Sequence, residues 1–208
     1  MKYVKMLGLA AIAAAALTAI VGAGSASATV LCSTTVEPCP AGQQWLNTTL
    51  DWSIPAGGSV LQTDTTGEPI NTCKESTAKW TMIKNGGVNE TVTGEDELTT
   101  FGGCNFPTTT IKLAKTEIHK IAGTSNGTVT ADGVTEITIN TVLFGSCIYG
   151  VPNGASIGDI TEGNPATFHV NAVTKRLGGS AFCPETDRWT ATYTLTSPVN
   201  TTLSVGNS

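Results

Sequence analysis

The stretch RWTATYTLTS, residues 188–197, alternates apolar and polar side chains without a fault from Trp189 to Thr196. A period of two residues is that of a β-strand with one buried face. The predicted buried face carries Trp189, Ala191, Tyr193 and Leu195, and the opposite face carries Thr190, Thr192, Thr194 and Thr196. Threonine suits a solvated strand face because it is both β-branched and polar.

Other parts of the chain repeat this pattern less completely. Alternation recurs in AKWTMIK (78–84), VTEITINTVL (134–143) and ATFHVNAV (166–173). Turn-forming residues separate these segments: NGG at 85–87, TGED at 93–96, NGT at 126–128, ADG at 131–133, VPNG at 151–154 and EGNP at 162–165. Many short strands without helical crossovers predict an all-β fold, an antiparallel β-sandwich of immunoglobulin-like or related Greek-key type, stapled by disulfides.

The segment Ile111–Ala122 fits two interpretations. Ile111, Ala114, Ile118 and Ile121 have helical spacing, with Gly123 placed as a stop. As a strand, the segment must change phase between Leu113 and Ile118 through a bulge or a break. The β-rich surroundings favour the strand, but both interpretations stay open at this stage.

The N-terminus has the order of a secretory signal peptide. Lys2 and Lys5 precede an apolar run over residues 6–24, and Ala26-Ser27-Ala28 resembles a cleavage site. We therefore expect a signal peptide at residues 1–28 and a single secreted domain at 29–208. A lipid anchor on Cys32 is disfavoured because Leu31, a large residue, stands before that cysteine. FGGCNF (101–106) resembles FGSCIY (144–149), which leaves a weak two-half pseudo-repeat possible within the domain.

The net charge of the chain limits the classes of binding partner that we expect. The chain carries 11 basic and 16 acidic residues, a net charge of −5. Without Lys2 and Lys5 the balance is 9 against 16, or −7. An acidic chain without a basic cluster is unsuited to nucleic acid, and we expect no membrane association after cleavage. The expected partner is an extracellular protein or a glycan.

All six cysteines follow the predicted cleavage site. An even number in an exported chain predicts three disulfides. The nearest-neighbour pairing joins Cys32 with Cys39, Cys73 with Cys104, and Cys147 with Cys183. Zinc is disfavoured because no C-x-x-C occurs and His119 and His169 lie away from the cysteines. The sequence indicates no metal and no cofactor.

No motif in the sequence strongly indicates an enzyme active site. GTSNG (123–127) and GASIG (154–158) match G-x-S-x-G but lack the strand-to-helix context of a nucleophile elbow. His119 and His169 are expected to be solvated. GEDE (94–97) is the acidic cluster of the chain; it could collect calcium, but a solvated acidic loop is the favoured interpretation. We therefore predict no catalytic residues.

Trp45 and Trp52, in QQWLNTTLDW, are the tryptophans expected on loops. Exposed and coplanar, they would form a stacking platform for sugars. Trp80 and Trp189 lie on apolar strand faces, where core packing explains them.

Four segments together resemble a loosely defined group of uncharacterised, cysteine-containing secreted proteins from high-GC Gram-positive bacteria. They are LCSTTVEPC (31–39), FGGCNFPTTT (101–110), GSCIYG (145–150) and RWTATYTLTSP (188–198). The resemblance implies a disulfide-bearing, β-rich exported domain and brings no ligand or catalytic residues.

The sequence thus favours an exported, non-enzymatic domain with a structural or interaction role outside the cell. A carbohydrate-binding module that uses Trp45 and Trp52 is the first alternative. A secreted hydrolase with two carboxylates about 5–10 Å apart is the second.

Overall fold

The computed structural model describes residues 28–87, 90–142 and 145–208. The protein is all-β, and one short 3-10 turn, η1 (Ala41–Gln43), is the helical element within these residues. Its strands are β1 (Thr29–Cys32), β2 (Thr49–Ser53), β3 (Val60–Thr63), β4 (Pro69–Cys73), β5 (Glu75–Gly87), β6 (Glu90–Gly102), β7 (Thr108–Lys112), β8 (Lys115–Lys120), β9 (Gly127–Asp132), β10 (Thr135–Thr141), β11 (Gly145–Val151), β12 (Ser156–Thr161), β13 (Thr167–Gly179), β14 (Thr186–Ser197) and β15 (Ser204–Asn207).

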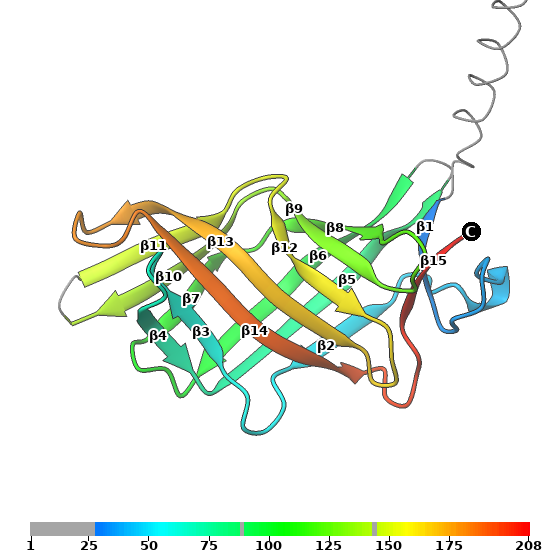
Figure 1. Ribbon diagram of the computed structural model, residues 1–208, viewed down its shortest axis with the longest axis horizontal. Coiled ribbons are helices and arrows are strands. Elements are labelled where there is room, and N and C mark those ends of the chain that lie inside the picture. Colours follow the sequence, from blue (N-terminus) through cyan, green and yellow to red (C-terminus); the bar gives the residue numbers. More distant parts are fainter. Residues whose placement is uncertain (1–27, 88–89, 143–144) are drawn as a thin grey trace, which may run out of the picture.

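The main sheet closes into an eight-stranded antiparallel barrel, elongated along the horizontal axis of Figure 1. Most of its strands run as two segments separated by a bend or a short excursion: β2/β3, β4/β5, β7/β8, β9/β10 and β11/β12. Each composite strand pairs with the next one along the chain. β14 then pairs with β2 and β3, the first composite strand, so the ring is complete.

The predicted sandwich with Greek-key connections is therefore wrong in its finer part, although the all-β class and the disulfides are confirmed. The strands follow an up-and-down order in one sheet that closes on itself, not two sheets packed face to face. Alternation in the sequence records only that one face of each strand is buried. A barrel and a sandwich both satisfy that pattern, and the pairing of β14 with β2 and β3 decides between them.

The interior faces are those that the alternation predicted. In β14 the side chains of Trp189, Ala191, Tyr193 and Leu195 are buried, and their four threonine neighbours are exposed or half-buried. The outer face is hydrogen-bonded as well as solvated: the Thr190 hydroxyl donates to the Leu61 carbonyl and Thr196 to that of Asp51. The threonine row thus bonds the closing strand to its neighbours.

Leu113 and Ala114 interrupt the strand that runs through Ile111–Ala122. Strands β7 and β8 lie on either side of this break, so the strand interpretation is confirmed and the helix is wrong. The TGED segment is not a turn as predicted, because Thr93–Asp96 lies inside β6. EGNP lies between β12 and β13, and VPNG falls between β11 and β12 apart from Val151, as expected. NGG is not a separate turn, because it lies inside β5, and NGT and ADG overlap the two ends of β9.

All three disulfides join the predicted pairs: Cys32–Cys39, Cys73–Cys104 and Cys147–Cys183. The second links the bend between β4 and β5 to the segment after β6. The third links β11 to the turn between β13 and β14. The predicted signal peptide lies outside the described residues except for Ala28, and so does Phe144 of the pseudo-repeat.

One end of the barrel is covered by the two terminal strands. β1 and β15 form a separate antiparallel pair at the right of Figure 1. Leu31, Leu203 and Val205 of this cover are fully buried in the main core. Asn85 of β5 fastens it: its side chain accepts from the Leu31 amide at 2.6 Å and donates to the Leu31 carbonyl at 3.2 Å and the Trp45 carbonyl at 2.6 Å.

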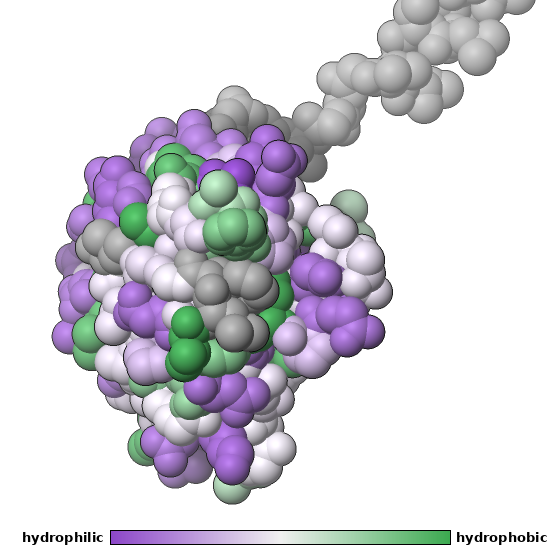
Figure 2. Space-filling model, turned by 90° about the vertical axis from the view of Figure 1, so that its left-hand side faces the viewer, coloured by the Kyte–Doolittle hydropathy of each residue, from purple (hydrophilic) through white to green (hydrophobic). Residues whose placement is uncertain are grey.

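The opposite end carries exposed apolar side chains. Val142, Leu177 and Phe182 are exposed there, in or beside the β10–β11 and β13–β14 turns. Figure 2 looks onto this end and shows apolar groups interspersed with hydrophilic ones.

Replacing Asn85 with alanine should lower the free energy of unfolding by about 2–4 kcal/mol, because three hydrogen bonds are lost and main-chain groups of the cover lose their partners. Asn140→Ala, at an exposed position of β10, is the matched control and should change it by less than about 0.5 kcal/mol. Chemical denaturation of both variants measures the difference. Equal effects would show that Asn85 does not hold the cover in place.

Candidate functional site

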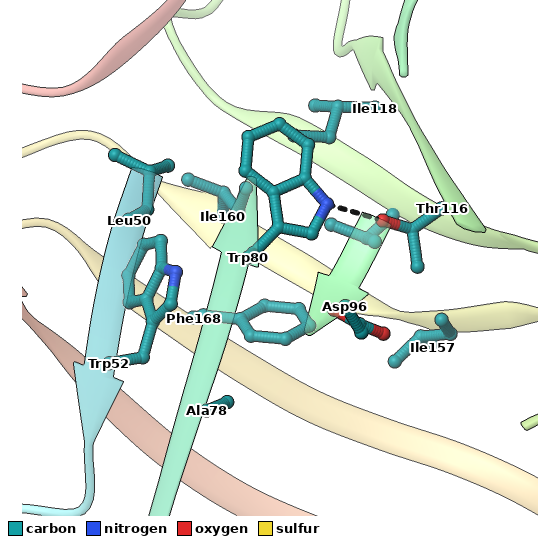
Figure 3. Close-up of a pocket in the computed structure, with 11 residues that line it drawn as sticks. Leu50, Trp52, Ala78, Trp80, Asp96, Thr116, Ile118, Ile157, Ile160 and Phe168 are labelled. Atoms are coloured by element: carbon teal, nitrogen blue, oxygen red, sulfur yellow. Dashed lines mark hydrogen bonds between the residues drawn. The ribbon is translucent and has the colours of Figure 1, made fainter. Parts of the chain in front are cut away.

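The interior of the barrel is not completely filled near its middle. A cavity of about 60 Å³ lies between β2, β5, β6, β8, β9, β12 and β13. Its walls are apolar and rich in aromatic rings, as Figure 3 shows for Trp52, Trp80 and Phe168. Two polar side chains, Asp96 and Thr116, also line it.

Trp80 is held in a fixed position beside this cavity. Its indole N–H donates to the Thr116 hydroxyl at 2.8 Å, and the dashed line in Figure 3 marks this bond. A Cβ atom on Gly94 would lie 2.0 Å from the Trp80 ring, so the ring packs directly on the main chain of β6. The bond to Thr116 occupies the only donor of the indole, and the ring presents its apolar face to its surroundings.

Asp96 lies directly across from Trp80 in the pairing of β5 with β6. Its main-chain N–H donates to the Ala114 carbonyl at 3.4 Å. Among the described residues, no group donates a hydrogen bond to its carboxylate and none forms an ion pair with it. The side chain keeps some accessible surface because it faces the cavity, although protein atoms surround it densely. Burial raises the pKa of Asp96 from 3.8 to about 7.

The barrel wall has a lateral gap beside Asp96. β6 pairs with β8 from Val92 to Glu95, but it forms no ladder with β7 in the described chain. The Thr110 hydroxyl bonds to the Thr99 carbonyl across this gap. An outer groove of about 500 Å³ lies along it, and Asp96 lines both the groove and the interior cavity. Asp96 is therefore the residue that the cavity and the groove share.

Three consecutive acidic residues of β6, Glu95, Asp96 and Glu97, line the groove. Glu95 and Glu97 flank Asp96 and point to the other face of β6. Glu97 forms a surface ion pair with Lys79 at 2.8 Å. The predicted acidic loop GEDE is thus part of a strand, and its middle carboxylate turns inward. Alternation from Val92 to Asp96 was the available signal, but the turn-forming Thr93-Gly94 pair obscured the strand.

Trp45 and Trp52 do not form the exposed pair that a sugar platform requires. Trp52 is 5% exposed and lines the interior cavity. Trp45 is half-buried beside a separate surface groove at the covered end of the barrel. The structure therefore gives Trp52 a role inside the barrel and leaves Trp45 as a single aromatic side chain near the surface.

The remaining sequence candidates are dispersed. Ser125 lies in the turn before β9, and Ser156 begins β12 on the exposed side. His119 bonds to Thr130, and His169 bonds to Thr167 and Thr192. Neither match to G-x-S-x-G is followed by a helix in the described chain. Within that part of the chain, no group of three or more His, Cys, Asp and Glu side chains is placed to hold a metal ion.

A second buried carboxylate, Asp187, lies in the other half of the barrel. One of its oxygens accepts from the Thr174 hydroxyl, its cross-strand partner, while burial raises its pKa to about 6. Tyr149 is fully buried close to it, and burial is the main cause that raises the pKa of Tyr149 to about 12. Unlike Asp96, Asp187 has a protein partner and is only 2% exposed. We assign it a structural role.

Comparisons with known protein families, curated proteins and solved structures find no match. The site is therefore interpreted from its own geometry. In the described part of the chain, no helix has the length and apolar character needed to span a membrane.

Gly94→Ala should destabilise the barrel by about 1–3 kcal/mol, because the added methyl group overlaps the Trp80 ring and forces it off Thr116. Gly42→Ala is the control, since a Cβ at Gly42 meets nothing within 4 Å. Thermal unfolding and the near-ultraviolet circular dichroism of the tryptophans report the effect. An unchanged signal in Gly94→Ala would contradict the close packing.

Asp96→Asn should stabilise the protein increasingly as the pH rises from 4 to 7. Over this range folded Asp96 keeps a proton that the unfolded chain releases, so the wild type loses stability as the pH rises. The loss is complete above pH 7 and reaches up to about 4 kcal/mol for the shift from 3.8 to about 7. Asp187 contributes with the same sign up to about pH 6 in both proteins.

Denaturation at a series of pH values measures this difference, with exposed Asp132→Asn as the control. If the stability difference between Asp96→Asn and the wild type did not depend on pH, Asp96 would not be held in an apolar environment.

Proposed function

We propose that this protein is an exported, non-enzymatic barrel that acts by binding a small molecule in its interior beside Asp96. The observation that carries the proposal is an unpartnered carboxylate in a cavity whose other walls are mostly apolar and aromatic. Ligand sites typically combine such walls with a few polar groups that orient the ligand. An eight-stranded barrel has an interior wide enough to hold one small ligand.

Stability alone does not explain Asp96. A buried carboxylate without a partner disfavours the folded state, and an apolar or amide side chain at the same position avoids that cost. Sites that depart from the rules of stable packing are commonly functional. The side gap supports the same interpretation, because it places the carboxylate next to an outer groove that leads to solvent.

Export is proposed on the basis of the N-terminal pattern, and the three disulfides are compatible with it because such bonds persist in oxidising compartments. The two alternatives gain less from the structure. A sugar platform would have to rely on Trp45 without Trp52. A two-carboxylate hydrolase needs a second acid near the first, and Asp96 is the single carboxylate among the residues that line the interior cavity.

The test uses n-propanol, whose short chain suits a cavity smaller than the roughly 150 Å³ that accepts benzene. Titration should shift the indole N–H resonances of Trp52 and Trp80 in a saturable way. Ala78→Leu, which places a larger side chain in the cavity wall, should abolish the shifts. Ala181→Leu, at an exposed position, should leave them unchanged. Shifts that persist in a folded Ala78→Leu variant would show that the alcohol binds elsewhere.

A further inference from the structure

We infer that the interior site selects small organic cations, in which an ammonium group pairs with the Asp96 carboxylate and a short apolar part lies against the aromatic walls. This inference rests on the proposed function and specifies the ligand's charge. Three features support it: the hydrogen-bonding groups of the cavity, its aromatic rings and the charge of the outer groove beside it.

The carboxylate of the cavity can only accept hydrogen bonds, and the one O–H donor of the described lining residues that stays free is that of Thr116, which accepts from Trp80. The Trp80 N–H is already bonded to the Thr116 hydroxyl. The Asp96 carboxylate lacks a donor among the described residues, and no lysine or arginine lines the cavity. A ligand that completes this site must therefore supply N–H or O–H donors. An anion would meet a carboxylate with no compensating charge and is disfavoured.

The rings favour a cation over a neutral donor. Trp80 lies across from Asp96, and Trp52 and Phe168 line the same cavity with ring centroids 6.0 Å apart. An ammonium group near an aromatic face is attracted by the ring quadrupole, and the attraction is larger in a desolvated site. A charged hydrogen bond to a carboxylate is also about twice as strong as a neutral one.

The charge of the outer groove next to Asp96 also favours a cation. The outer groove at the side gap presents Glu95 and Glu97 around Asp96. Lys79 is engaged with Glu97 on the surface. The chain as a whole is acidic, so its field attracts cations toward the groove. The carboxylate, the rings and the groove therefore select for the same ligand charge.

Binding of a cation should be linked to ionisation of Asp96. The empty site favours the protonated acid, since burial raises the pKa of Asp96 to about 7. An ammonium ion binds the ionised form, so its affinity should increase about tenfold between pH 6 and pH 8.

Asp96 is the only charged residue among the described residues that line the cavity. The charged neighbours on its own and the adjacent strands are Lys79 of β5, Glu95 and Glu97 of β6 and Lys115 of β8, and Tyr193 of β14 also interacts electrostatically with Asp96. The same strands carry further charged or titratable residues that do not line the cavity: Asp51, Glu75, Lys84, Glu90, Glu117, His119, Lys120, Asp132, Asp159, His169, Lys175, Arg176, Asp187 and Arg188.

The experiment compares propylammonium, n-propanol and propionate by the same tryptophan resonances at pH 6 and pH 8. We expect propylammonium to bind at least tenfold more tightly than propanol at pH 8, and propionate to be the weakest. Asp96→Asn should remove both the preference for the cation and its pH dependence. Glu97→Gln is the matched comparison, because it removes the same charge from the groove on the same strand. It should weaken propylammonium binding less than Asp96→Asn does, and it should leave the pH dependence in place.

The outcomes separate the two proposals. If none of the three probes binds the folded protein, interior binding itself is wrong. If propanol binds as well as propylammonium, and Asp96→Asn binds both as the wild type does, the cavity binds small molecules but does not select cations. If Glu97→Gln reduces cation binding as much as Asp96→Asn does, the preference comes from surface charge, and the interior pairing is overturned. The wild-type pH profile tests the inference even if a variant fails to fold.

Discussion

The pairing of β14 with β2 and β3 is the constraint on which the rest of the structure depends. A sheet of this size without closure would expose two edges of unpaired main-chain groups. Because β14 bonds to β13 on one side and to β2 and β3 on the other, the sheet closes and acquires an interior. All inward side chains then face one another across a narrow space. The cavity, its rings and the buried carboxylates exist because this space is enclosed.

Much of the local structure could be predicted from the sequence, and the closure could not. The alternation at 189–196 correctly identified the faces of β14, and the disulfide pairing followed from cysteine order. Alternation does not specify which strand lies beside which, so it left barrel and sandwich equivalent. The pairing of β14 with β2 joins residues more than 140 positions apart, and no local pattern records such a contact.

The candidate site escaped prediction for a related reason. Asp96 belongs to a cluster of acids that composition alone marks as a solvated loop, and Gly94 strengthens that interpretation because glycine is common in turns. In the structure Gly94 serves a different purpose: it allows the Trp80 ring to pack on the main chain of β6. For Trp52 the error was the reverse: the sequence predicted an exposed ring on a loop, and the structure places the ring inside the barrel. Both errors concern residues whose environment is made by strands distant in sequence.

Asp187 is a second interior carboxylate with which Asp96 can be compared. Both carboxylates lie inside the same barrel, and burial raises the pKa of each. One oxygen of Asp187 accepts from Thr174, and the other is buried without a partner, but the residue has almost no accessible surface and lines none of the cavities described above. Asp96 has a cavity in front of it, and beside it are the break between β7 and β8 and the gap in the wall. Four other composite strands are also broken, so the break alone does not set Asp96 apart. The missing ladder between β6 and β7 does, because it coincides with the interior carboxylate that has no hydrogen-bond donor among the described residues. A barrel arranged for stability alone would complete this ladder, because unpaired main-chain groups weaken the wall.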